Sequence, residues 1–131
     1  MSMNNIPVYE KTPRVERGAL SAANTNRDGT GTIVTILTAG ADGTVVRRIT
    51  INSIGTTTAG MVRLYHHNGT SYTLLKEIPV TAITPSGTVE AWSEVIEYFG
   101  DEGLRLPTGH SIRGSTHNAE NFHVLIEGND F

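Results

Sequence analysis

The sequence contains no cysteine. This absence excludes disulfide scaffolds, thiolate zinc sites and cysteine nucleophiles. It leaves the compartment open, because a cysteine-free chain is equally suited to reducing and oxidising surroundings. Helix signals are nearly absent too, since the one stretch with helical leanings, residues 89–99, alternates in a way that fits a strand at least as well.

Long apolar runs and a strong charge of one sign are missing as well. No segment approaches the roughly 20 apolar residues of a membrane helix, and the N-terminus lacks the basic-then-apolar layout of a secretory signal. The formal net charge of −3 offers no broad electrostatic surface to nucleic acid. We therefore expect neither a membrane nor a nucleic acid as a partner.

The chain divides into two parts of different character. Its 131 residues suit one domain with a core that needs no disulfide or metal. Residues 1–30 show no sustained apolar period, whereas residues 31–131 form a string of Thr- and Val-rich segments separated by Gly-containing turns. The sequence thus predicts an extended N-terminal arm over residues 1–30 and a β-sandwich domain over residues 31–131.

The domain is expected to be all-β. About eight short strand candidates with turns between them are typical of a sandwich or barrel, and a jelly-roll-like β-sandwich is our choice. Asn68-Gly69 is a strong hairpin signal between two of these candidates. The candidates cover residues 32–38, 44–54, 61–67, 72–80, 89–99, 104–107, 110–115 and 121–127.

The arm is the predicted attachment element. Pro7 and Pro13 favour extended backbone, and the arm carries four basic residues against three acidic ones. Segments of this kind gain order by lying across a neighbour's surface, as in strand addition. Asn24 to Gly31 is interpreted as a flexible joint, and a disordered tail is the alternative for the whole arm. The predicted partner-binding residues are Ile6, Pro7, Val8, Tyr9, Lys11, Pro13, Arg14, Val15, Arg17 and Leu20.

The histidines do not predict a metal site. His66 and His67 are neighbours in a strand candidate, so their side chains point to opposite faces. His110, His117 and His123 could converge near the last hairpin with Glu120, but they lack a recognised ligand spacing. We therefore expect ordinary surface histidines, with no metal and no cofactor.

No catalytic constellation is recognisable either. Ser, Thr and carboxylates are abundant, but no Gly-x-Ser-x-Gly elbow occurs. A carboxylate pair for glycoside hydrolysis would have to come from Glu90, Glu94, Glu97, Asp101 or Glu102. Glu90 and Glu94 share a strand face with Trp92 between them, which indicates a solvated or interface edge. Gly29-Thr30-Gly31 lacks the Lys and the helix of a phosphate loop. We expect no enzymatic activity and no catalytic residue.

Four segments carry a resemblance to a known class of protein: residues 21–35, 55–64, 77–85 and 115–120. With these strings the chain, from about Thr12 to Phe131, resembles small β-rich virion proteins of tailed phages, in particular capsid decoration (cement or auxiliary capsid) proteins. The resemblance implies a non-enzymatic homo-oligomer, often a trimer, on the outer surface of the head, made in the host cytoplasm. It implies the major capsid protein as the partner and assigns no individual binding residue.

Two other functions stay open. The protein could belong to the tail, an adaptor or a fibre of the phage. It could instead be a carbohydrate-binding module in which Trp92, Tyr65, Tyr72 and Tyr98 stack on sugars, although one tryptophan and scattered tyrosines are more often core or interface residues.

Overall fold

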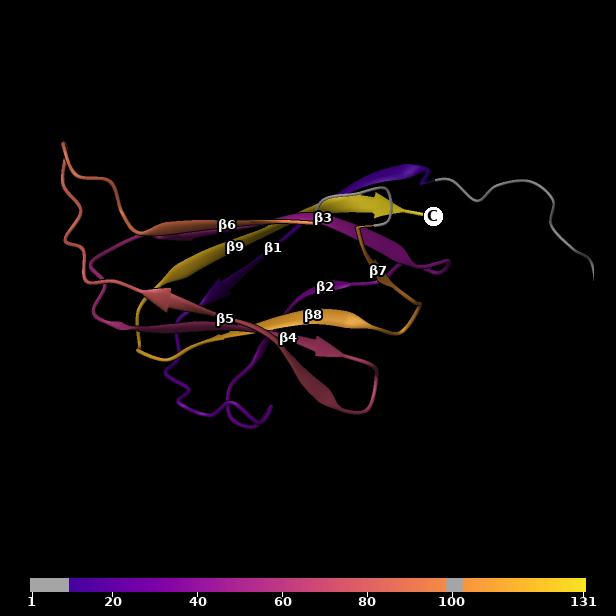
Figure 1. Cartoon of the computed structure of the whole chain (residues 1–131), viewed down its shortest axis with the longest axis horizontal. Helices are drawn as coiled ribbons and strands as arrows, with labels where there is room; N and C mark the ends of the chain where they lie inside the picture. The colour runs from indigo at the N-terminus through magenta and orange to yellow at the C-terminus, as the bar shows by residue number, and fades with distance from the viewer. Residues whose placement is uncertain (1–9, 99–102) are drawn as a thin grey trace, which may run out of the picture.

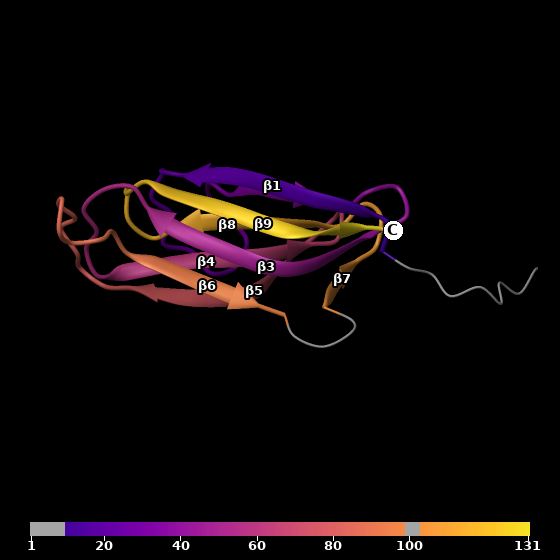
Figure 2. The same ribbon diagram turned by 90° about the horizontal axis from the view of Figure 1, so that it is seen from above.

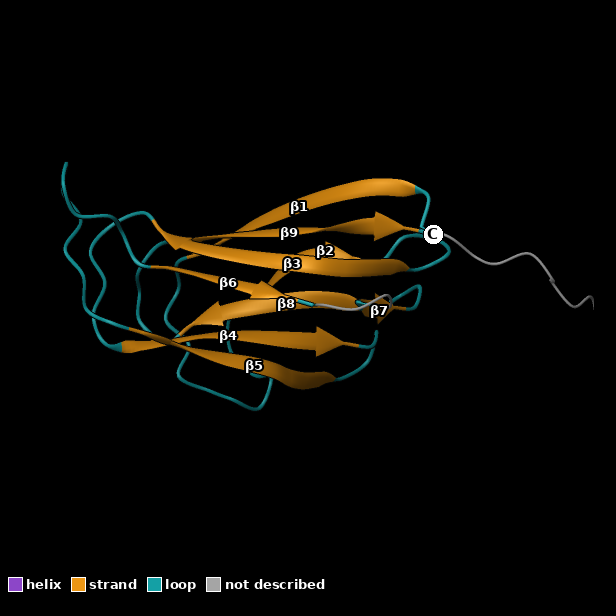
Figure 3. Cartoon of the chain, turned by 45° about the horizontal axis from the view of Figure 1, so that its top comes forward, coloured by secondary structure: helices purple, strands orange, loops and turns teal. Residues whose placement is uncertain are grey.

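The structure is a computed structural model of the chain that describes residues 10–98 and 103–131. Within these ranges every regular element is a β-strand, as Figure 3 shows. There are nine strands in the described ranges: β1 (Thr12–Leu20), β2 (Val34–Thr38), β3 (Thr44–Ser53), β4 (Gly60–His67), β5 (Tyr72–Val80), β6 (Ser93–Glu97), β7 (Leu104–Leu106), β8 (Ser111–Thr116) and β9 (Phe122–Asp130).

The strands form two antiparallel sheets that lie face to face (Figure 1). The first sheet has the order β1-β9-β3-β6, with the short β7 also paired to β3, and the second has the order β2-β8-β4-β5. The pairs are nested along the chain: β4 pairs with β5, β3 with β6, β2 with β8, and β1 with β9. A long antiparallel ribbon rolled up in this way is a jelly roll, so the predicted all-β sandwich is confirmed.

The core lies between the two sheets and follows the period of two along each strand. In β9, Phe122, Val124 and Ile126 are buried, and β3 places Ile49 and Ile51 beside them. The opposite sheet contributes a matching set to the same cluster: Val62, Leu64, Ile78 and Ile112. Alternation of inward apolar and outward polar side chains is what an antiparallel sheet with one packed face requires.

The structure differs from the expected boundary between arm and domain. Residues 12–20 are not an arm but the edge strand β1, paired with β9 in a continuous register from Thr12↔Asp130 to Leu20↔Phe122. The period of two is hidden in the sequence because the inward positions of β1 hold Arg14, Glu16 and Gly18. Only Leu20 enters the core, with 1% of its surface exposed.

The expected flexible joint is also built into the domain. Residues 21–33 cross the outer face of the second sheet, where Ala23 bridges Thr116 of β8. Asn24 is buried, and its side-chain Nδ2 donates to the carbonyl oxygens of Thr30 and Thr32, each at 2.9 Å. The Tyr65 hydroxyl donates to the Asn26 carbonyl at 3.0 Å. This segment therefore covers β4 and does not separate the arm from the domain.

Candidate attachment surface

Both ends of the described chain lie at one end of the sandwich, as Figures 1 and 2 show for the C-terminus and the start of β1. The Lys11 amide donates to the Asp130 carbonyl at 2.8 Å, and the Phe131 amide donates to the Gly43 carbonyl at 3.2 Å. Glu10 also forms an ion pair with Arg47 of β3. The N-terminal segment, residues 1–9, therefore joins the domain beside its C-terminus.

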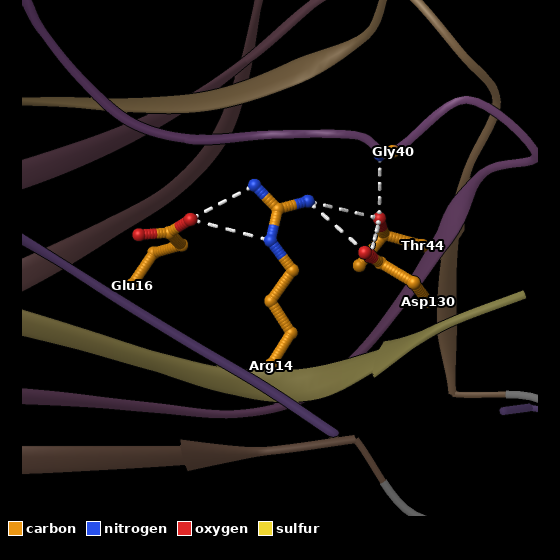
Figure 4. A network of polar contacts seen from close by, with 5 residues as sticks. All are labelled: Arg14, Glu16, Gly40, Thr44 and Asp130. Atoms are coloured by element: carbon orange, nitrogen blue, oxygen red, sulfur yellow. Dashed lines mark hydrogen bonds and ion pairs between the residues drawn. The ribbon is translucent and has the colours of Figure 1, made fainter. Parts of the chain in front are cut away.

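A polar network fixes this end of the sandwich (Figure 4). Arg14 donates from Nη1 to Asp130 Oδ1 at 3.2 Å and from Nη2 to Glu16 Oε2 at 2.9 Å. Thr44 is fully buried; its hydroxyl donates to Asp130 Oδ1 at 2.6 Å and accepts from the Gly40 amide at 2.9 Å. Burial alone would lower the pKa of Arg14, but the hydrogen bonds to Glu16 and Asp130 outweigh it and raise the pKa.

The structure divides the predicted partner-binding residues into three groups. Ile6, Pro7, Val8 and Tyr9 lie outside the described residues. Leu20 belongs to the core and Arg14 to the network, so both serve the domain itself. The remaining four are exposed at or within β1: Lys11, Pro13, Val15 and Arg17.

An open hollow of about 480 Å³ lies on the outer face of the first sheet. It is lined from three strands, β1, β3 and β9, and its floor is low at Ala19, whose side chain is a single methyl group. Arg17, Asn52 and His123 give it hydrogen-bond donors. The lining residues are Arg17, Gly18, Ala19, Asn52, His123, Val124 and Leu125.

A buried arginine holds the covering segment against the second sheet. Arg63 of β4 is 1% exposed and donates to Glu77 Oε2 at 2.9 Å, to the Asn24 carbonyl at 3.1 Å and to His117 Nδ1 at 3.2 Å. Arg27, on the covering segment, reaches the same Glu77 oxygen at 2.6 Å. These hydrogen bonds from Arg27 and Arg63 lower the pKa of Glu77. No sequence signal marked this cluster, because Arg63 occupies an ordinary outward position of an alternating strand.

The histidines do not converge on one site, although two of them are in contact. His66 Nε2 and His110 Nδ1 are 2.8 Å apart, whereas His117 contacts Arg63 and His123 is exposed on β9. Burial, together with the charges of His110 and His67, lowers the pKa of His66. Among the described residues no three metal-ligating side chains come together.

The other residues considered for chemistry either form hydrogen bonds within the domain or lie on different segments. Glu120 accepts from the Thr58 amide and hydroxyl. Glu94 and Glu97 lie on β6, Glu90 lies on the preceding loop, and Asp101 and Glu102 lie outside the described residues. Asn68 caps its hairpin by accepting from the Thr70 and Ser71 amides.

No described helix is long and apolar enough to cross a membrane.

Two of the four aromatic residues considered for sugar stacking are buried. Trp92 packs edge-on against Phe122, with ring centroids 5.6 Å apart, and Tyr65 lies beneath the covering segment with no exposed surface. Tyr72 lies edge-on to Tyr65 and receives a hydrogen bond from Arg113. Tyr98 is half-buried, which raises the pKa of its hydroxyl. A sugar needs an exposed ring face, so Trp92 and Tyr65 cannot provide a platform in this structure.

No protein-family model matches the chain, and no curated protein matches it in sequence. Among solved structures, the chain is similar to the "Cyanophage Pam1 capsid asymmetric unit", with 13% identity and a TM-score of 0.44 over 99% of this chain and 94% of that chain. A likeness this weak establishes neither a shared fold nor a shared function.

Proposed function

We propose that the protein is a structural component of a tailed-phage virion and, more specifically, a capsid decoration protein. In this role it binds the outer head surface and stabilises contacts between major capsid subunits. Its synthesis in the host cytoplasm, a homotrimeric state and the absence of enzymatic activity belong to the same proposal. The sequence resemblance over residues 12–131 supports it, and the jelly-roll sandwich is compatible with it.

The position of the chain ends is the observation that carries the attachment role. The network of Arg14, Thr44 and Asp130 fixes the end of the sandwich from which the N-terminal segment departs. Nine residues span at most about 30 Å when extended. Ile6, Val8 and Tyr9 can each contribute about 1.5–3 kcal/mol if fully buried against a capsid subunit, less the cost of ordering. Several copies in one oligomer would multiply such weak contacts.

Removal of the N-terminal segment tests attachment. A variant that lacks residues 1–9 keeps β1, Leu20 and the polar network, so we expect a folded domain with greatly reduced binding to capsids stripped of this protein. A full-length variant with Ile6→Ser, Val8→Ser and Tyr9→Ser is the matched control for chain length, and it should bind as weakly. Undiminished capsid binding by both variants, measured by co-sedimentation, would refute attachment through this segment.

Copy number separates decoration from the alternative of a tail, adaptor or fibre protein. Quantitative mass spectrometry of purified particles should give hundreds of copies, in a fixed ratio to the major capsid protein. A few copies per particle would place the protein in the tail. The remaining alternative, a carbohydrate-binding module, predicts specific binding on a glycan array, and failure to bind any glycan would count against it.

A further inference from the structure

The first sheet ends in two strands that have one strand neighbour each. Within the described residues, β1 pairs only with β9 and β6 pairs only with β3. An edge strand offers free backbone N–H and C=O groups to another chain. Three antiparallel steps separate β1 from β6 in the order β1-β9-β3-β6, so the two edges run in opposite directions. A second copy placed alongside in the same orientation would therefore bring its β1 antiparallel to β6.

The two edges carry opposite charge. Lys11 and Arg17 are exposed at and within β1, and Glu94 and Glu97 are exposed on β6. Glu97 has a distant partner in Arg48 at 3.8 Å. Arg17, which forms no ion pair within the described part of the chain, lies on the same outer face of the sheet as Glu97, whereas Glu94 pairs with the buried Ile51 on the inner face. Complementary charges of this kind select a partner and fix its register.

Each edge also exposes one valine on the same outer face of the sheet. Val15 of β1 is 60% exposed and Val95 of β6 is 46% exposed. Val15 lies opposite Glu127, next to the buried Ile126, and Val95 lies opposite Thr50, between the buried Ile49 and Ile51. Apolar side chains on both edge strands would come within reach of each other if the two edges paired across copies.

We propose that β1 of one copy pairs antiparallel with β6 of a second copy, which extends the first sheet across the interface. The contact is head-to-tail, so a rotation that closes it gives a ring of identical subunits. The inference rests on the proposed function for the expectation that the chain self-associates, and it assigns the strands that do so. It leaves the N-terminal segment and the chain ends available for the capsid.

Charge reversal on each edge tests the pairing in the purified full-length protein. Wild type should be oligomeric in sedimentation-velocity and light-scattering measurements, and added salt should weaken the oligomer. Arg17→Glu and Glu97→Arg should each raise the dissociation constant by on the order of tenfold, because like charges then lie on the same face of the paired edges. The double variant should recover wild-type association. Asp42→Arg, an exposed charge reversal on neither edge strand, is the matched control.

The pattern across these variants separates the possible interfaces. A contact of β1 with β1 would respond to Arg17→Glu and ignore Glu97→Arg, and that result would overturn the proposal. A monomeric wild type would also overturn it. So would a control variant, Asp42→Arg, that loses as much association as the edge variants do. Circular dichroism of each variant distinguishes dissociation from unfolding.

The proposed function and the proposed edge pairing are tested by different measurements. Capsid binding and copy number are measured on particles, whereas edge pairing is measured on the isolated protein. A virion protein that stays oligomeric in both charge-reversal variants would leave the decoration role standing and remove the edge pairing. Absence from the virion, with the expected charge pattern in solution, would do the reverse.

Discussion

Arg14 Nη1 lies 3.2 Å from Asp130 Oδ1, although 116 positions separate the two residues in the chain. This contact joins the first strand to the last, at the end of the sandwich where the described chain begins and ends (Figure 4). It anchors the strand from which the N-terminal segment departs.

Loss of this guanidinium should weaken the fold. Arg14→Met removes both ion pairs of Arg14, at Glu16 and Asp130, and leaves partly buried carboxylates without their cation. We expect the free energy of unfolding, measured with a chemical denaturant, to fall by about 1–2 kcal/mol. Lys76→Met is the control and should change it by less than about 0.5 kcal/mol, because Lys76 is exposed on β5, outside the proposed edge contact. Equal losses in the two variants would contradict a structural role for the network.

Two arginines that share one carboxylate oxygen should differ sharply in their contribution. Arg63 has 1% of its side chain exposed and Arg27 has 61%, yet both donate to Glu77 Oε2. Arg63→Met leaves the Asn24 carbonyl and His117 without their donor and should cost about 2 kcal/mol or more. Arg27→Met should cost less than about 0.5 kcal/mol, as exposed ion pairs contribute little. The Arg63 variant should also become sensitive to proteolysis within residues 21–33. Resistance to proteolysis there would argue against the role of Arg63 in holding this segment to the sheet.

The His66–His110 pair should make stability depend on pH. The fold lowers the pKa of His66 below its ordinary value of 6.5, so the unfolded chain binds a proton there more readily. The stabilisation is therefore present in full above about pH 6.5 and is lost as the pH falls through the lower folded-state pKa. Urea unfolding should be measured from about pH 7.5 to about pH 5, on either side of that value. The free energy of unfolding should fall less over this range in His66→Gln than in wild type. His123→Gln, at an exposed position on β9, should keep the wild-type loss.

A glycine in β9 lets this strand lie close against β3 where the register between the two shifts. A Cβ at position 128 would collide with the Val45 carbonyl group of β3, at the point where the register between β3 and β9 shifts. Gly128→Ala should therefore destabilise the protein by about 3 kcal/mol, because backbone would have to move. Gly87→Ala has no atom within 4 Å of its new Cβ and should leave the melting temperature nearly unchanged. Similar melting temperatures for the two variants would contradict this packing.

The truncation used for attachment must stop before Thr12. Removal of residues 1–20 would delete β1, expose the core at Leu20 and leave β9 as a new edge. We expect this longer variant to unfold or aggregate in a sedimentation assay, because the loss of Leu20 alone costs about 2–5 kcal/mol. Loss of capsid binding by that variant would therefore say nothing about the N-terminal segment, whereas the variant lacking residues 1–9 can.

Sequence alone located each strand after residue 30, because alternation and turn residues are local properties. The alternation of residues 89–99 predicts one strand, but the observed strand is shorter, Ser93–Glu97. Residues before it form a loop in which Trp92 turns into the core against Phe122. Such a boundary depends on what the neighbouring strand offers, since hydrogen-bonded pairing ends where β3 ends at Ser53.

What the sequence by itself determined is the all-β class, the positions of eight strands and the apolar positions within them, because each follows from periods of two and from turn residues. Only the tertiary structure decided that Thr12–Leu20 is a strand, since its pairing partner β9 lies at the other end of the chain. It also decided that Arg63 is buried, because the covering segment reaches β4 only once the ribbon has rolled up. Contacts between residues far apart in the chain leave no local pattern, and the network and both sheet edges consist of such contacts.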